Sequence, residues 1–150
     1  MRIARYLAVV VLGALLTACG ASGHAYRIEV LIAVAGNGYH GYAEQDGSRW
    51  VLKVDPEFSY TLGYTERVIA HELGHCRGLG HRDEQGCLMQ REIGLFRLCA
   101  DDAERAVGYG PASRIVVLDE SLRQYVVLAA EFWNEAVGSV IFEVLPARAD

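Results

Sequence analysis

The chain has 150 residues, with 14 Lys or Arg and 19 Asp or Glu, which gives a formal net charge of −5. This length is enough for one domain with a hydrophobic core. No cluster of basic residues is present, so nucleic acid is excluded as an expected partner.

The first residues have the pattern of an export signal. Residues 1–5 carry two arginines, and residues 6–16 form an apolar run with one glycine. This run is too short to span a membrane comfortably and has the flanks of a signal peptide. We therefore expect residues 1–18 to be removed. Because Arg2 and Arg5 leave with them, 132 residues remain with a formal charge of −7.

The end of this signal, Leu16-Thr17-Ala18-Cys19, resembles the bacterial lipobox. The resemblance implies that Cys19 is acylated and holds the mature protein to a membrane surface without a spanning helix. Gly20 is not the aspartate that retains lipoproteins in the inner membrane. The resemblance therefore implies the outer membrane of a Gram-negative cell, facing the periplasm or the exterior. Ordinary secretion with cleavage near Ala18 is the alternative. Residues 19–25 would be a linker before a domain at 26–150.

Three strands are predicted next. Residues 26–34 are strongly apolar and rich in branched side chains, which indicates a buried strand. Residues 39–45 form a shorter, more polar strand, and a turn at Asp46-Gly47 leads to an alternating strand at 49–54.

The segment from His71 to His81 predicts a metal-binding helix followed by a turn. His71 and His75 are one helical turn apart on one face, so both imidazoles can reach one ion. Glu72 lies beside the first ligand, where it can take a proton from water at the metal. Gly78 can end the helix in the left-handed conformation, which lets His81 turn back as a third ligand. Thr65 is the predicted N-cap of this helix.

This segment resembles the metzincin zinc peptidases, whose pattern is H-E-x-x-H-x-x-G-x-x-H followed by a Met-turn. Cys87-Leu88-Met89-Gln90 looks like that turn, and Met89 follows His81 by eight residues, as in the matrixin branch. The resemblance implies one catalytic Zn²⁺, with Met89 as an apolar floor beneath its histidines. Astacins and serralysins place a tyrosine ligand two residues after the methionine. Arg91 stands at that position here.

The cysteines fit an oxidising compartment. With Cys19 acylated, Cys76, Cys87 and Cys99 remain, and this odd number implies one disulfide and one free thiol. We favour Cys87–Cys99, which would join the Met-turn to the next helix. Cys76 is then a small buried side chain. Cys76–Cys87 is the competing pair.

The C-terminal part has an unexpected order. After a helix at about 101–108 and Pro111, the sequence predicts a strand at 114–118, a helix at 120–137 ended by Gly138, and a strand at 140–145. A metzincin domain normally opens with such a strand, helix and strand. We therefore expect a circular permutation, in which this helix covers the other face of the sheet. The alternative is that residues 112–150 form an unrelated appendage.

The expected fold class is therefore α+β, with a twisted mixed sheet of about five strands, an active-site helix, a helix after the Met-turn and a C-terminal helix packed on the sheet. Strand 39–45 would be the edge strand above the metal. Family members align peptides antiparallel to this edge, which implies contacts at Gly41, Tyr42 and Ala43. An ordinary exposed edge is the alternative for each of them.

The expected function is that of a zinc-dependent endopeptidase acting on peptide or protein substrates. The second possibility is a lipid-anchored, zinc-containing binding protein without peptidase activity. A third reading replaces His81 as metal ligand by Glu92 or Glu104.

Overall fold

The structure is a computed structural model, which describes residues 25–34, 38–57, 62–92, 96–99 and 101–147. Its strands are β1 (Arg27–Ile32), β2 (Gly41–Asp46), β3 (Arg49–Val54), β4 (Ser113–Val117) and β5 (Phe142–Val144). Its helices are α1 (Thr65–Cys76), α2 (Asp102–Gly108), the short 3₁₀ helix η1 (Glu120–Leu122) and α3 (Arg123–Val137). The predicted signal peptide, the predicted acylation site Cys19 and most of the linker lie outside the described residues.

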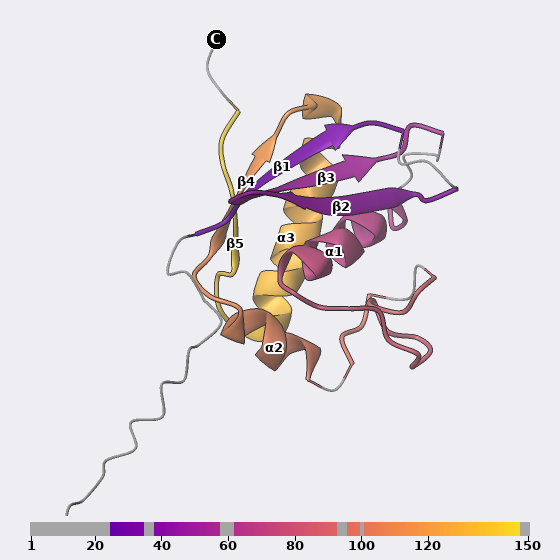
Figure 1. Ribbon diagram of the computed structural model, residues 1–150, viewed down its shortest axis with the longest axis vertical. Helices are drawn as coiled ribbons and strands as arrows, with labels where there is room; N and C mark the ends of the chain where they lie inside the picture. Colours follow the sequence, from indigo (N-terminus) through magenta and orange to yellow (C-terminus); the bar gives the residue numbers. More distant parts are fainter. Residues whose placement is uncertain (1–24, 35–37, 58–61, 93–95, 100, 148–150) are drawn as a thin grey trace, which may run out of the picture.

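The five strands form one mixed sheet in the order β2-β3-β1-β4-β5 (Figure 1). β1 lies at the centre, parallel to β3 on one side and to β4 on the other. β5 is parallel to β4, and β2 is the antiparallel edge strand beside β3. The predicted class, α+β with a mixed sheet of five strands, is confirmed at this level.

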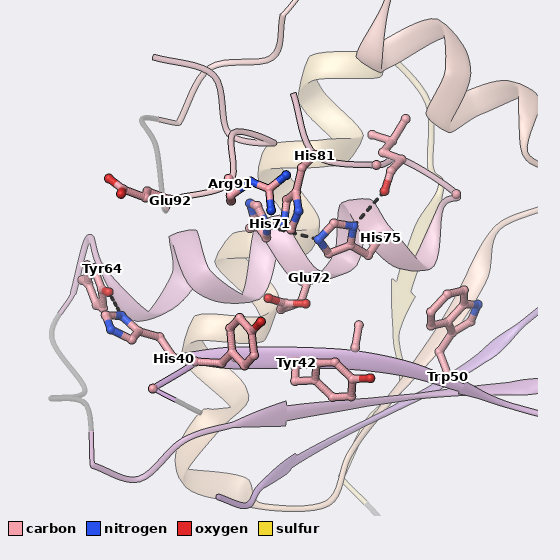
Figure 2. Close-up of a pocket in the computed structure, with 17 residues that line it drawn as sticks. His40, Tyr42, Trp50, Tyr64, His71, Glu72, His75, His81, Arg91 and Glu92 are labelled. Atoms are coloured by element: carbon pink, nitrogen blue, oxygen red, sulfur yellow. Dashed lines mark hydrogen bonds between the residues drawn. The ribbon is translucent and has the colours of Figure 1, made fainter. Parts of the chain in front are cut away.

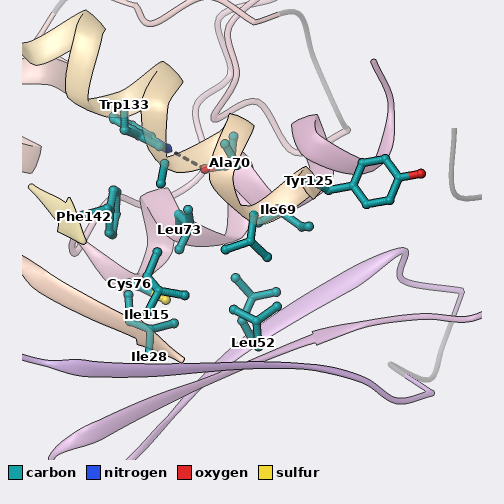
Figure 3. Packing of buried hydrophobic residues seen from close by; sticks show 14 of the residues in the cluster. Ile28, Leu52, Ile69, Ala70, Leu73, Cys76, Ile115, Tyr125, Trp133 and Phe142 are labelled. Carbon is teal, nitrogen blue, oxygen red and sulfur yellow. Dashed lines mark hydrogen bonds between the residues drawn. The ribbon is translucent and has the colours of Figure 1, made fainter. Parts of the chain in front are cut away.

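Both long helices pack on the same face of the sheet. The buried apolar side chains of the strands belong to one core cluster that also contains apolar side chains of α1 and α3, and Figure 3 shows the strands on one side of these residues and the helices on the other. Trp133 of α3 donates an indole N–H to the carbonyl oxygen of Ala70 in α1, at 2.8 Å. The expectation that α3 covers the other face was wrong, because α1 is too narrow to bury the whole apolar face of the sheet.

The opposite face of the sheet is charged instead. Arg27 and Arg49 lie side by side on adjacent strands, and both pair with Glu29, at 2.9 and 3.0 Å. Arg114 continues this row on β4 and lies opposite Glu143 on β5. Alternation along β1, β3 and β4 therefore directs the fully buried apolar side chains to the helices and these charged side chains away from them.

Residues 112–147 belong to the same core as the rest of the chain. They contribute two strands of the five and helix α3, whose buried positions recur at helical spacing: Tyr125, Val126, Ala129, Ala130 and Trp133. Gly138 ends α3 with a φ of 70°, as predicted. The alternative of an unrelated appendage was therefore wrong.

The start of the first strand and the end of the last lie near each other. The register aligns Ile28 with Ile115, and Ile115 with Val144, so Ile28 and Val144 share one row across β4. Two strand spacings separate them by roughly 10 Å. This proximity is what a circular permutation requires; the last residue, Asp150, lies outside the described part.

The loop after α1 is fastened by a disulfide between Cys87 and Cys99, whose Cα atoms are 5.5 Å apart. This is the pairing that the sequence favoured, and Cys76 is left as a buried thiol. Among the described residues, no helix is both long enough and apolar enough to cross a membrane.

Candidate metal centre

Helix α1 and the turn that follows it carry the three histidines. At the start of the helix, the carboxylate of Glu66 accepts a hydrogen bond from the backbone N–H of Gly63. Tyr64, not Thr65, occupies the N-cap position, and its side chain makes no capping bond. The prediction of Thr65 as N-cap was therefore wrong by one residue, because Thr65 already has helical backbone and is the first residue of α1.

A glycine turn ends α1 and brings the chain back toward the metal site. Gly78 has a φ of 75°, and its N–H donates to the carbonyl of His75 at 2.9 Å. Leu79 donates to the carbonyl of Gly74 at 3.1 Å, which completes a Schellman motif. A Cβ at Gly78 would also overlap the ring of Tyr109. The prediction for Gly78 is confirmed, and the reversal directs the chain toward His81.

The three imidazoles converge through their Nε2 atoms. The Nε2 of His71 is 3.1 Å from that of His75 and 3.2 Å from that of His81. His71 donates through Nδ1 to the carbonyl of Leu88 at 2.6 Å. His75 donates through Nδ1 to the carbonyl of Leu79 at 2.7 Å (Figure 2). Because a carbonyl oxygen can only accept, these bonds place the proton of each ring on Nδ1.

This arrangement fits a cation. In His71 and His75 the Nε2 atoms present lone pairs to each other at 3.1 Å, and neither has a proton to share. A positive ion between them relieves this repulsion. The three histidines are accordingly a group that can hold a metal ion, with ligand atoms within 4.8 Å of one another.

The imidazoles are kept neutral, as metal ligands must be. Burial lowers the pKa of His71 to about 4, with further lowering by His75 and His81. Burial also lowers the pKa of His75 and of His81, and the positive charge of Arg91 adds to the effect on His81. These shifts favour the neutral form of each ring, which is the form that binds a metal ion.

Glu72 lies between the histidines and the edge strand β2 (Figure 2). Burial raises the pKa of its carboxyl group to about 7, although the backbone amide of Ala43 lowers it. A Cβ at Gly41 would contact the side chains of Val68 and Glu72, so only a glycine lets β2 pass this close to α1. A carboxyl group in this position can exchange protons near neutral pH.

Met89 lies under the histidine-bearing helix. It is fully buried, and a Cβ at Gly74 would overlap its sulfur and approach Trp133. Gly74 is in α1 between His71 and His75, so Met89 packs against the backbone that carries both ligands. A position beneath the histidines is what the resemblance to metzincins implied for Met89.

An open cleft of about 890 Å³ extends along β2 past the metal site. The three predicted contact residues, Gly41, Tyr42 and Ala43, all line it. Its two ends differ. At one end His40 Nδ1 is bonded to the hydroxyl of Tyr64, and at the other lie Trp50 and the turn at 78–80 (Figure 2).

The alternative third ligands are not placed for that role. Glu92 lines the cleft, but no glutamate joins the histidine group within the described ranges, and Glu104 lies on α2 outside the cleft lining. A second group, Glu84 with Cys87 and Cys99, could offer ligand atoms, but both of its thiols are consumed by the disulfide.

Sequence reasoning missed the groups that orient the ligands. The backbone carbonyls of Leu79 and Leu88 orient the rings of His75 and His71. Every residue has a backbone carbonyl, so the sequence does not indicate which one is used. It also missed Arg77, the C-cap residue of α1, which is buried and bonded to the α2–β4 connection. The available signal was an arginine placed between Cys76 and Gly78, the glycine that ends the helix.

Comparison with protein-family models, with curated proteins and with solved structures found no match to this chain.

Proposed function

We propose that the protein is a zinc-dependent endopeptidase of metzincin type. The observation that carries this proposal is the convergence of three Nε2 atoms beside a buried carboxyl group, at the floor of a cleft bounded by an edge strand. Three imidazoles are ligands typical of a catalytic zinc site, which keeps one position open. Nitrogens bound to tetrahedral zinc at about 2.0–2.1 Å lie roughly 3.3 Å apart, close to the separations here.

His71, His75 and His81 would hold the ion. When bound, zinc polarises the carbonyl of the scissile peptide bond and makes water a better nucleophile. Glu72 takes the proton from the attacking water and passes it to the leaving amine. Its raised pKa suits both steps, because a group near 7 can accept and release a proton at neutral pH.

The edge strand supports an extended peptide substrate. β2 pairs with β3 on one side, and its other edge borders the cleft. A peptide can add to this edge through main-chain hydrogen bonds. Gly41, Tyr42 and Ala43 line the cleft along this edge, so a peptide paired with it would pass the three histidines.

The metzincin proposal includes the permuted chain order and the lipid anchor. Residues 113–144 supply the strand, helix and strand that open a metzincin domain, joined here after α2. Acylation of Cys19 would place the enzyme on the cell envelope. Mass spectrometry of the mature protein tests this: the N-terminal peptide should carry fatty acyl groups, and the Cys19→Ala variant should lack them.

The decisive experiment replaces the carboxyl group and leaves the metal ligands intact. Glu72→Ala should keep one zinc per chain by elemental analysis, while hydrolysis of a peptide library falls by a factor of roughly 10²–10⁴. Glu104→Ala, which removes an exposed carboxyl group on α2, is the matched control and should retain activity. Undiminished hydrolysis by Glu72→Ala would refute the proposal.

A further inference from the structure

The direction of β2 determines how a peptide would lie in the cleft, and the following inference rests on the proposed peptidase function. β2 begins beside the His40–Tyr64 pair and ends beside Trp50, which is the register partner of Gln45. A peptide antiparallel to β2 therefore runs from the Trp50 end toward the His40 end. Its C-terminal half, which leaves as the amine product, passes His40 and Tyr64.

Arg91 and Glu92 form the wall opposite β2 on this leaving-group side. Both line the cleft. Figure 2 shows the guanidinium of Arg91 beside the rings of His71 and His81, whereas the Glu92 carboxylate points away from them, toward the end occupied by Tyr64. Within the described part of the chain, no carboxylate lies within ion-pair distance of Arg91.

A cation in this position opposes metal binding. The guanidinium of Arg91 lies beside the ring of His81 in Figure 2, so its charge repels a divalent ion held by that ring. Two carboxyl groups line the cleft: Glu72 lies on the β2 side of the histidines, and Glu92 points away from Arg91. The positive charge of Arg91 is therefore left for an anion that enters the cleft.

We propose that Arg91 binds a carboxylate of the substrate on the leaving-group side of the scissile bond. Two sources share this chemistry: an acidic side chain just after the bond, or the C-terminal carboxylate of a short peptide. The planar guanidinium can hold either through two parallel hydrogen bonds. The enzyme would accordingly prefer peptides that are acidic after the cleavage site.

The test measures binding without turnover. The full-length Glu72→Gln protein, loaded with zinc in detergent, is titrated with hexapeptides blocked at both ends. Each peptide carries a single Asp at a different position, and a matched peptide has Asn at the same position. A further pair compares a free with an amidated C-terminus. At one position, or at the free terminus, the carboxylate form should bind roughly tenfold tighter or more.

Arg91→Met in the same background should abolish this ratio. Arg114→Met, which removes an equal charge from the opposite face of the sheet, should leave it unchanged. Zinc affinity is a second test of this role, because the Arg91→Met protein should bind zinc at least as tightly as the parent protein. A merely structural arginine would weaken zinc binding when removed.

Equal binding of every matched pair of Asp and Asn peptides, with no gain at a free terminus, would overturn the role of Arg91. So would a preference that survives Arg91→Met. Hydrolysis by the unmodified protein tests the peptidase function separately. Cleavage without a preference for acidic peptides would refute only the role of Arg91. A preference for acidic peptides in binding, without any cleavage, would refute only the peptidase function.

Discussion

Arg77→Met tests how the turn after the histidine helix is held. Arg77 is 1% exposed, and its guanidinium donates to the carbonyls of Ala106, Gly110 and Pro111 at 2.8–2.9 Å. It also reaches Ser113 Oγ at 3.3 Å, and the ring of Tyr109 lies 5.4 Å away. One side chain thus ties the C-cap of α1 to the connection between α2 and β4.

The free-energy cost of the substitution follows from these contacts. Methionine fills much of the volume but leaves three carbonyls without a donor, at about 1–3 kcal/mol each. Loss of the charge offsets part of this cost, because burial disfavours the charged guanidinium and lowers its pKa, and its hydrogen-bond partners Ala106, Gly110, Pro111 and Ser113 are all neutral. We expect a net loss of about 3 kcal/mol, which lowers Tm by roughly 10 °C for a domain of this size.

Calorimetry on the metal-free protein measures this loss without the stabilisation that a bound ion adds. Arg114→Met is the control, because its side chain is 64% exposed and such pairs contribute about 0–1 kcal/mol. Zinc affinity should fall in Arg77→Met as well, because the same turn carries Leu79 and His81. A Tm equal to that of the control would refute this account of the turn.

Three further predictions concern the same region. In the metal-free protein, Glu72→Gln should be more stable than the parent at pH 8 by about 3 kcal/mol. The folded-state pKa of Glu72 is raised to about 7, so its stability cost develops as the pH rises from 4.5 to 7, and urea unfolding at pH 4.5 should show little difference. Gly78→Ala should cost about 3 kcal/mol and weaken zinc binding, because φ is 75° and the new Cβ meets Tyr109. Gly80→Ala, with no atom within 4 Å of the added Cβ, is its control, and equal zinc affinity in the two variants would contradict the assignment. Replacement of both Cys87 and Cys99 by serine should lower the free energy of unfolding by about 3 kcal/mol through loop entropy, measured by urea titration, and an unchanged midpoint would count against a contribution from the disulfide.

Local spacing was enough to predict much of the candidate site. His71 and His75 are brought together by the helical repeat, and Gly78 ends the helix because its backbone permits a positive φ. The bounds of β3, the end of α3 at Gly138 and the disulfide were likewise predicted from local pattern or residue type. Each of these depends on geometry within a few residues, or on a choice among three cysteines.

Contacts between distant segments were decided only by the tertiary structure. The carbonyl that orients His71 comes from Leu88, 17 residues later, and the groups bonded to Arg77 lie about 30 residues away. That α3 packs beside α1, instead of behind the sheet, depends on how much apolar strand surface one helix can cover. Hydrophobic periodicity shows which side of a helix is buried, but it does not identify the surface that buries it.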